Sequence, residues 1–497
     1  MTYRGEVKRI GIAIAASVLA IAAPLSASAA SDGLDSYRAQ KLNWHECDAG
    51  LCADLRVPLD YGDLGKGDIT LALSKTVHSG PTSQGSIVIN PGGPGESGLT
   101  FGWYAAKFLA PAVAREFDFI GFDPRGVGKS APVTCMTPKQ TAQMLAMDAS
   151  PDTPKEVAQV MRAAARVSKG CLRFSPRVSP YVGTASSAKD LDILRSALGE
   201  DRLNWLGFSY GTALGTRYLE DFPDHVGRFV LDGALDPSLN SMQTSAGQSA
   251  GFQRAFQNFA ASCGARKGCT LGNSAADVTG KVNALLARLD QHPLPTDQGP
   301  RLTQALGMSG MLTAMYSTEL WKPLSDAIMQ ALNGDGTGLL ELAWQGQEQE
   351  GPTKFTSNIQ SAYYAIDCWD NPKPPGAAGL GQAAKRWSAN APVPEFAKSI
   401  AWSNAPCTSW FAHDPQRPAP TSSSTKTPVL VIGTRSDPAT PYEWAQALSS
   451  QLPTSTLLTY EGNGHTAYGS GSKCINDLVD RYLLRGTLPA KGTSCPA

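Results

Sequence analysis

The chain has 497 residues and carries 43 basic and 43 acidic side chains, so its formal net charge at pH 7 is zero. This length is enough for a large hydrophobic core and predicts two or three structural units. Balanced charge without a long basic run excludes the electrostatic footprint of nucleic-acid-binding proteins and of proteins held on anionic membranes. We therefore expect neither nucleic acid nor a membrane as a stable partner.

Segment 1–30 has the three parts of a secretory signal peptide. It contains the basic residues Arg4, Lys8 and Arg9, an apolar run over 10–23 and the small residues of 27–29. The apolar run is shorter than the ~20 residues that a membrane-spanning helix needs, which disfavours the alternative of an uncleaved anchor. We expect cleavage near Ala29 or Ala30 and a mature protein that is secreted and extracellular.

Ten cysteines fit an exported chain, because an even number can pair completely in an oxidising compartment. The sequence does not fix the connectivity, but neighbouring cysteines close the shortest loops. Local spacing favours the pairs Cys47–Cys52, Cys135–Cys171, Cys263–Cys269, Cys368–Cys407 and Cys474–Cys495. The sequence lacks a C-x-x-C pair and an H-E-x-x-H motif, so it predicts no zinc site, and we expect no cofactor.

The first predicted elements are strands. Residues 55–59 and 69–77 predict an opening hairpin, and the β-branched run 86–89 predicts a short buried strand. That strand leads into the glycine-rich stretch 90–95, Asn-Pro-Gly-Gly-Pro-Gly, which leaves backbone N–H groups uncovered. A further buried strand is predicted at 117–122.

Residues 203–212 predict a strand, a sharp turn and a helix in immediate succession. The turn is Gly207-Phe208-Ser209-Tyr210-Gly211, a G-x-S-x-G pattern whose glycines let the strand and the helix approach closely. Such a strained turn lifts the serine hydroxyl clear of the sheet for attack on a carbonyl carbon, so Ser209 is the candidate nucleophile. The alternative is a chance G-x-S-x-G in a glycine-rich chain, but the flanking strand and helix favour the nucleophile.

Two backbone N–H groups are candidates for an oxyanion hole. In hydrolases with such a turn, one donor belongs to the residue after the serine and the other to a glycine loop after an earlier strand. These donors correspond here to Tyr210 and, within one residue, to Gly93. The alternative for the glycine loop is an ordinary turn that needs positive φ angles.

Strands and helices alternate around this turn. Helical patterns at 154–168 and 187–198 precede it, and a helix ending at Phe222 and a strand at 228–232 follow it. The alternation predicts right-handed crossovers and an α/β fold, with a mostly parallel sheet covered by helices on both faces.

The character of the chain changes at Pro237. Up to about 405 it shows helical patterns, at 249–261, 278–289 and 320–332, and no convincing strand-rich run. The sheet pattern resumes after a Pro/Ser/Thr-rich linker, 415–428, with predicted strands at 429–433 and 455–460. We therefore divide the mature chain into a sheet-forming core, 31–236, a helical cap insertion, 237–405, and the C-terminal part of the core, 406–497. An insertion at this point would lie above the carboxyl ends of the strands, where such sheets bind ligands.

The remaining catalytic candidates follow the last two predicted strands. His465 lies in a glycine-containing turn after the final strand, from which a base could reach back over the sheet. Asp437 follows the strand before it and could fix the tautomer of the histidine and stabilise the imidazolium. The order Ser209, Asp437, His465 is the order that this architecture uses.

Rival candidates exist for the acid and the base. Asp232 and Asp236 follow an earlier strand, although they could equally cap a loop and the next helix. The other histidines lie beside a cysteine, in an early loop, at a helix end, between loop prolines or near the linker, where structural roles are favoured: His45, His78, His225, His292 and His413.

The assembled pattern resembles the α/β-hydrolases of the proline iminopeptidase and tripeptidyl aminopeptidase kind, in particular the secreted bacterial tripeptidyl aminopeptidases. The resemblance is carried by the segments 90–95, 123–128, 207–212, 230–233, 437–441 and 464–465. It implies an exopeptidase that removes short peptides, tripeptides foremost, or single residues from the free N-terminus of a peptide or protein. It also implies that Ser209, Asp437 and His465 form the catalytic triad.

A substrate ammonium drawn under a cap loses much of its water and needs a carboxylate to compensate. Asp370 is the favoured anchor, because similar Ile-x-Cys-x-Asp stretches recur in the family that the chain resembles. Asp367 and Glu96 are alternatives, and Asp370 could instead cap the turn at Asn371. Glu96 departs from the family pattern, since a small residue more commonly follows Gly-Gly-Pro-Gly, which leaves open whether its side chain joins substrate binding.

Composition and spacing alone predict a secreted serine hydrolase, and peptide specificity depends on the resemblance. The same triad would serve an esterase or lipase that acts on small acyl esters and needs no free α-amine. A third alternative is an inactive hydrolase fold used as a binding module, against which the intact triad argues.

Overall fold

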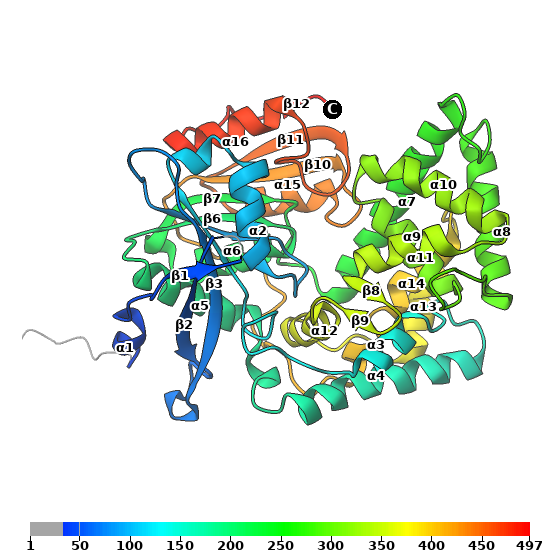
Figure 1. Ribbon diagram of the computed structural model, residues 1–497, viewed down its shortest axis with the longest axis horizontal. Helices are drawn as coiled ribbons and strands as arrows, with labels where there is room; N and C mark the ends of the chain where they lie inside the picture. The colour runs from blue at the N-terminus through cyan, green and yellow to red at the C-terminus, as the bar shows by residue number, and fades with distance from the viewer. Residues whose placement is uncertain (1–32, 49) are drawn as a thin grey trace, which may run out of the picture.

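The computed structural model describes residues 33–48 and 50–497 (Figure 1). The predicted signal peptide, 1–30, lies outside the described residues. Within the described part of the chain, every helix is too short or too polar to cross a membrane. Figure 1 shows a sheet with flanking helices on one side of the molecule and a separate group of helices on the other.

The described residues form one ten-stranded sheet and a small two-stranded sheet. The spatial order of the large sheet is β1 (His45–Cys47), β2 (Gly50–Pro58), β3 (Asp68–Thr76), β5 (Asp118–Phe122), β4 (Ser86–Asn90), β6 (Leu203–Phe208), β7 (Val226–Asp232), β10 (Val429–Ser436), β11 (Ser455–Asn463) and β12 (Ser494–Cys495). Pairing is antiparallel from β1 through β3 to β5, and parallel from β5 to β12. The predicted mostly parallel sheet is confirmed.

Helices cover both faces of this sheet, because alternate residues of each strand point to opposite sides. One face is covered by α2 (Gly98–Tyr104) and α16 (Lys473–Arg485), and the other by α5 (Thr184–Ala197), α6 (Tyr210–Asp221) and α15 (Tyr442–Gln451). In β4, Ile87 and Ile89 pack on the first face and Val88 on the second, and all three are fully buried. The β-branched run that predicted a buried strand therefore supplies both halves of the core.

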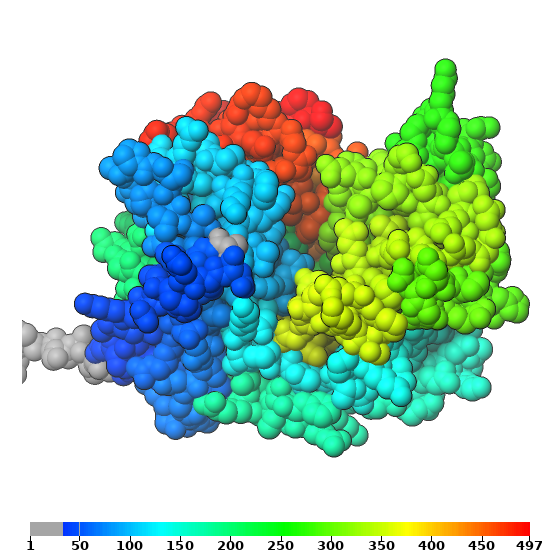
Figure 2. Space-filling model, viewed as in Figure 1, coloured from blue at the N-terminus to red at the C-terminus, as the bar shows by residue number. Residues whose placement is uncertain are grey.

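The chain between β7 and β10 is mainly helical and has its own hydrophobic core. Its helices are α7 (Ser241–Ala265), α8 (Ala275–Gln291), α9 (Gln304–Ala314), α10 (Trp321–Leu332), α11 (Thr337–Gly346), α12 (Ile359–Asp370), α13 (Ala377–Ser388) and α14 (Pro394–Trp402). A short hairpin of β8 (Gln349–Gly351) and β9 (Lys354–Phe355), which the sequence did not predict, lies between α11 and α12. Buried side chains of α7 to α11 pack on one another, and their green to yellow-green surface lies on the right of the molecule in Figure 2.

Helix α4 (Pro154–Phe174) was expected within the core segment 31–236, but it packs against the inserted helices. Val160 and Ala164 contact buried residues of α13 and α14, among them Leu380 and Trp402. The helical periodicity of α4 identifies an apolar face without identifying what covers that face. The helical layer therefore includes a segment that precedes β6 in the chain (Figure 1).

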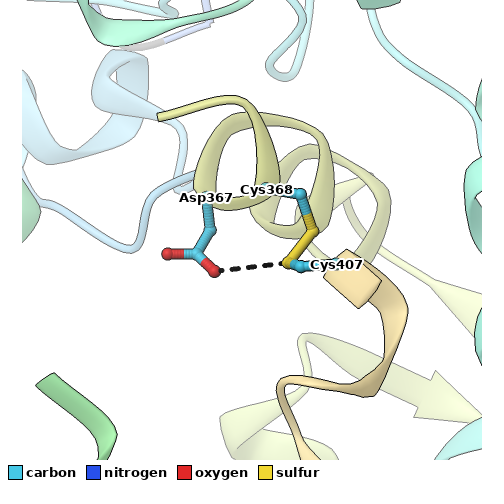
Figure 3. A group of neighbouring side chains, drawn as sticks. All are labelled: Asp367, Cys368 and Cys407. Atoms are coloured by element: carbon cyan, nitrogen blue, oxygen red, sulfur yellow. Dashed lines mark hydrogen bonds between the residues drawn. A yellow bond between two sulfur atoms is a disulfide. The ribbon is translucent and has the colours of Figure 1, made fainter. Parts of the chain in front are cut away.

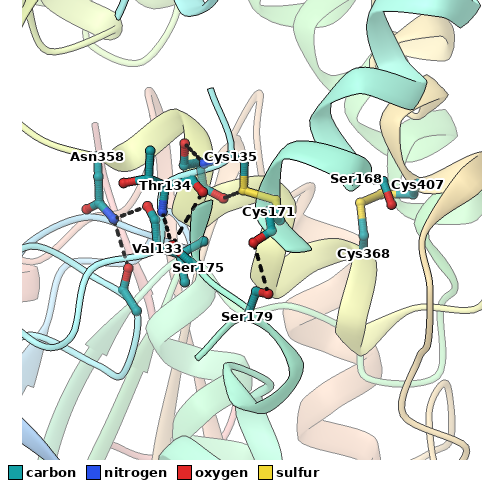
Figure 4. The surroundings of a disulfide bond; sticks show 12 residues. Val133, Thr134, Cys135, Ser168, Cys171, Ser175, Ser179, Asn358, Cys368 and Cys407 are labelled. Atoms are coloured by element: carbon teal, nitrogen blue, oxygen red, sulfur yellow. Dashed lines mark hydrogen bonds between the residues drawn. A yellow bond between two sulfur atoms is a disulfide. The ribbon is translucent and has the colours of Figure 1, made fainter. Parts of the chain in front are cut away.

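All ten cysteines are paired, and the five disulfides are those that local spacing favoured. Two of them flank α12. Figure 4 shows both bridges, Cys368–Cys407 and Cys135–Cys171. Cys368 lies on α12, and Cys135 donates its backbone N–H to Ser361 Oγ of α12 at 3.0 Å. These bonds fix α12, which carries two of the candidate acidic residues, against the neighbouring helices.

Candidate active site

The strand, turn and helix predicted around Ser209 are present. Strand β6 ends at Phe208 and α6 begins at Tyr210, so Ser209 alone forms the turn. Its φ of 52° and ψ of −121° lie in a region that L-residues rarely adopt. A Cβ atom on Gly207 would lie 2.5 Å from the carbonyl oxygen of Gly211, so this close approach of strand and helix requires glycine.

The glycine loop after β4 lies directly against this turn. Gly92 and Gly93 have positive φ angles of 116° and 101°. A Cβ atom on Gly92 would lie 2.9 Å from Ser209 Cβ and 3.2 Å from the backbone nitrogen of Tyr210. Gly93 and Ser209 line two cavities together, which are described below. The structure therefore brings the backbone segments of both predicted oxyanion donors, Gly93 and Tyr210, to the candidate nucleophile.

Asp437 and His465 form a direct pair. His465 Nδ1 lies 2.9 Å from Asp437 Oδ1 and 3.0 Å from Oδ2. The carboxylate is buried and also accepts the backbone N–H groups of Ala439 and Thr440, at 2.9 and 2.8 Å, and the hydroxyl of Thr440 at 3.0 Å. With Asp437 bonded to Nδ1, the other ring nitrogen of His465 is left for the reaction.

The environment of His465 favours its protonated form. Burial opposes the charged imidazolium, but the negative charge and hydrogen bond of Asp437, together with Asp232 and Glu96, outweigh that effect. The pKa of His465 is therefore raised above its ordinary value of about 6.5. The histidine acts as a base only in its neutral form, so this shift moves the onset of its basic function to higher pH.

Asp232 and Asp236, the rival acids, have other partners. Buried Asp232 accepts the backbone N–H groups of Ala467 and Tyr468, at distances of 2.7 to 3.1 Å, and thereby holds the loop after His465. Burial raises its pKa to about 6. Asp236 Oδ1 accepts hydrogen bonds from Ser238 and from the amide of Gln451.

Tyr316, which sequence reasoning missed, contacts the catalytic candidates from the inserted helices. Its carbonyl oxygen accepts the backbone N–H of His465 at 2.9 Å. Its ring packs edge to face on the imidazole, with 5.2 Å between ring centroids and an interplanar angle of 86°. A single tyrosine between α9 and α10 belongs to no motif, so the sequence holds no signal for this contact.

Ser209 lines a cavity of about 300 Å³, here called the inner cavity, which is also lined by Gly93, Tyr210, Asp367 and Asp370. Burial raises the pKa of Asp367 to about 6 and that of Asp370 to about 7. Two desolvated carboxylates therefore share one cavity with the candidate nucleophile.

The two carboxylates differ in their partners. Both oxygens of Asp370 accept from Thr184, one from its backbone N–H at 2.9 Å and the other from its hydroxyl. The Thr184 hydroxyl also bonds the phenol oxygen of Tyr210, so Asp370 is connected through Thr184 to the residue after the serine. Asp367 accepts one 3.2 Å hydrogen bond from the side-chain amide of Asn371. Cys407 Sγ lies 3.8 Å from Asp367 Oδ2, but this sulfur belongs to a disulfide and has no proton to donate.

The cluster of Asp367, Cys368 and Cys407 has the spacing of a metal site, but its sulfur atoms are bonded to each other. Figure 3 shows the Asp367 carboxylate beside this disulfide, with Oδ2 3.8 Å from Cys407 Sγ. Metals bind thiolates, so these three residues do not form a thiolate site.

Glu96 follows the glycine loop and lines a cavity together with Ser209 and His465. It also lines a second cavity, of about 690 Å³, between α3 (Pro138–Leu145), α4 and the inserted helices, together with Glu348 and Tyr316. Burial and the charge of Glu348 raise the pKa of Glu96. Glu96 is thus separated from the two aspartates, and the structure does not unite the three acidic candidates in one cavity.

A serine on a strained strand-to-helix turn, a glycine loop against it and a buried Asp–His pair on a mostly parallel sheet define an α/β-hydrolase of the serine hydrolase class. Residues 391–495 match the family model of the TAP-like proteins. The chain is 35% identical over 463 residues to serine protease Hip1 of Mycobacterium tuberculosis, which covers 90% of this chain and 87% of that protein.

Two further relatives carry different names. The chain is 32% identical to a tripeptidyl aminopeptidase of Streptomyces lividans, covering 95% of this chain and 88% of that protein. It is 34% identical to carboxylesterase B of Mycobacterium tuberculosis, covering 89% and 86%. The chain therefore belongs to the tripeptidyl aminopeptidase-like family of serine α/β-hydrolases.

Proposed function

We propose that this protein is a secreted serine exopeptidase that releases short peptides, tripeptides foremost, or single residues from the free N-terminus of a peptide or protein. The observation that carries the proposal is the pair of half-buried carboxylates with raised pKa values, Asp367 and Asp370, in a cavity that Ser209 also lines. An ester with an uncharged acyl group gains nothing from a nearby carboxylate, whereas a desolvated substrate ammonium requires a carboxylate to compensate its charge. Relatives named as a serine protease and a tripeptidyl aminopeptidase support the same function.

In the proposed reaction, Ser209 Oγ attacks the carbonyl carbon of the scissile bond while His465 Nε2 accepts the hydroxyl proton. The negative charge that develops on the carbonyl oxygen is stabilised by the backbone N–H groups of Gly93 and Tyr210. The C–N bond then breaks, and His465 returns the proton to the leaving nitrogen. Water hydrolyses the resulting ester of Ser209, again with His465 as base, and Asp437 stabilises the imidazolium in both halves of the reaction.

Asp367 is the better amine anchor of the two aspartates. Asp370 already accepts two hydrogen bonds from Thr184, so its role in our proposal is to hold Thr184 and, through it, Tyr210. Asp367 is desolvated, has one long hydrogen bond and lines the cavity, so a substrate ammonium would relieve the cost of its burial. This assignment reverses the order that the sequence favoured, which placed Asp370 first.

The inserted segment 237–405 acts in this proposal as a cap over the sheet, and α4 is part of it. The cap supplies Asp367, Asp370 and Tyr316 to a site whose nucleophile, acid and base come from the sheet. A cap of this kind restricts access to ends of chains that fit the cavity, which suits an exopeptidase better than an enzyme that cuts folded proteins internally.

The test compares three chromogenic substrates that share a leaving group: a tripeptidyl anilide with a free amine, the same compound with an acetylated amine, and an aminoacyl anilide. Preference for the free tripeptidyl compound by at least tenfold in kcat/KM is the expected result. Equal turnover of the free and acetylated compounds would favour the esterase alternative. The relative named carboxylesterase B is the observation behind that alternative. Labelling of Ser209 by a fluorophosphonate excludes the inactive binding module.

A further inference from the structure

A row of four aromatic side chains leads from the nucleophile turn to the surface. Phe208, next to Ser209, packs edge to face on Phe101 with 5.6 Å between ring centroids. Phe101 contacts Tyr104 at 5.7 Å, and Tyr104 contacts Phe108 at 5.4 Å. We call these four residues the aromatic track.

The outer half of the aromatic track is strongly exposed. Phe208 is only 4% exposed, but Tyr104 is 47% and Phe108 is 70% exposed. Exposed aromatic rings that continue a buried row are an unfavourable use of apolar surface unless a ligand covers them. Phe108 lies on a π-helical turn, Ala105–Leu109, a rare distortion that is common at functional sites.

The aromatic track borders a cavity of about 380 Å³, here called the outer cavity, which is lined by Phe101, Tyr104, Phe208, Ser209 and His465. Among the described residues, His465 lines the outer cavity and is not found among those that line the inner cavity. Ser209 and Gly93 line both cavities, so the nucleophile lies where they meet.

This division separates the two halves of the substrate. The leaving nitrogen receives its proton from His465, so the leaving portion must depart on the side of His465, which is the outer cavity. The acyl portion carries the free amine and belongs on the side of Asp367, which is the inner cavity.

We infer that the aromatic track binds the residues that follow the scissile bond and favours substrates in which those residues are apolar or aromatic. This inference rests on the proposed function. The occupant is the leaving segment of a polypeptide, because the track starts at the turn that bears the nucleophile. Its first three rings line the outer cavity, and Phe108 extends the row through its contact with Tyr104.

The track is also mechanically connected to the loop that carries His465. A Cβ atom on Gly469 would lie 1.8 Å from Leu109 Cδ1, so the π-helical turn packs directly against that loop. The outer cavity therefore has one wall from the track and another from the loop of His465 and Tyr468.

The test is a competition between two peptides with the same three N-terminal residues. One continues with Phe-Leu-Phe and the other with Ser-Gly-Ser, and both end in lysines for solubility. Mass spectrometry of both products in one tube gives the ratio of their kcat/KM values, which reports every step through acylation. We expect the wild-type enzyme to favour the apolar peptide by about tenfold, and the double variant Tyr104→Ser/Phe108→Ser to lower this ratio at least fivefold.

Two control variants accompany the test. Phe174→Ser removes a phenylalanine that is 43% exposed but lies at the end of α4, outside the aromatic track, and should leave the ratio unchanged. Tyr104→Leu/Phe108→Leu keeps the apolar surface and should retain most of the preference, which separates a binding role from a requirement for folding. All variants are compared by thermal unfolding.

The inference is overturned if the wild-type enzyme cleaves both peptides equally, or if the double serine variant keeps the wild-type ratio. If the double serine variant no longer bound phosphatidylcholine vesicles that the wild-type enzyme binds, but kept the wild-type peptide ratio, the exposed rings would be assigned to a lipid surface. That result would also overturn the inference. Hydrolysis of small esters without cleavage of either peptide would contradict the proposed function itself. Equal cleavage of both peptides would contradict only the role of the aromatic track, so the two failures can be distinguished.

Discussion

Replacing Asp367 by asparagine tests the amine anchor most directly, because the variant keeps the shape of the side chain and removes its charge. Burial raises the pKa of Asp367 from 3.8 to about 6. A tenfold change in proton affinity corresponds to about 1.4 kcal/mol, so the ionised carboxylate bears an unfavourable free energy of about 3 kcal/mol. A substrate ammonium that relieves this cost gains about 100-fold in affinity, within the range measured when one side of a buried charge pair is removed.

The assay measures kcat/KM at pH 7, which lies between the pKa of Asp367 and the value of about 7.7–8.0 for a peptide α-amine, so both partners are charged. We expect Asp367→Asn to lose about 100-fold on a free tripeptidyl anilide and less than threefold on a small uncharged ester. Asp370→Asn is the matched comparison, and it should lower both activities alike, because Asp370 holds Thr184 and Tyr210. Equal losses on both substrates for Asp367→Asn, or selective loss for Asp370→Asn alone, would refute this reasoning.

Further predictions concern the triad, the acid limb and a disulfide. Ser209→Ala should reduce turnover by ~10⁴-fold or more with an unchanged thermal unfolding curve, and retention of a tenth of the activity would contradict its role. The acid limb of the pH profile of kcat/KM should have its midpoint above about pH 6.5, because the pKa of His465 is raised. Glu96→Gln should move this midpoint to lower pH, because it removes a charge that favours the imidazolium. An unchanged midpoint would exclude an effect of Glu96 on the pKa of His465. Replacing Cys368 and Cys407 by serine opens a link between residues 39 apart and should lower the free energy of unfolding in urea by about 4 kcal/mol, whereas a loss under 1 kcal/mol would show that packing alone holds α12.

The sequence was informative where local chemistry decides the structure. The run at 86–89 and the turn at Ser209 were predicted because β-branched strands and flanking glycines act within a few residues. Asp437 and His465 were predicted as a pair because each follows a strand of one sheet and parallel strands end at the same edge, and the structure brings them within hydrogen-bonding distance.

Other features depend on partners that are remote in the chain. The choice between Asp367 and Asp370 turns on Thr184, which lies 186 residues from Asp370 and gives no local signal. The same is true of the contact of Tyr316 with His465 and of the packing of α4 on α14. The sequence shows a single aromatic ring in the first case and an apolar helix face in the second, but it does not show what either one contacts. Periodicity identifies the surfaces that must be buried. Only the tertiary structure shows which surfaces pack against each other.

The order of the disulfides along the chain has a consequence for how the protein matures. The cysteines pair as consecutive couples along the sequence, first with second, third with fourth and so on, and no loop closed by a bridge contains or crosses another. A polypeptide that enters an oxidising compartment from its N-terminus therefore exposes its thiols in matched couples, and each couple can close before the following thiol arrives. If the chain is exported, as we propose, emergence in this order would favour the native pairs, whereas a fully reduced chain released all at once presents every thiol to every other.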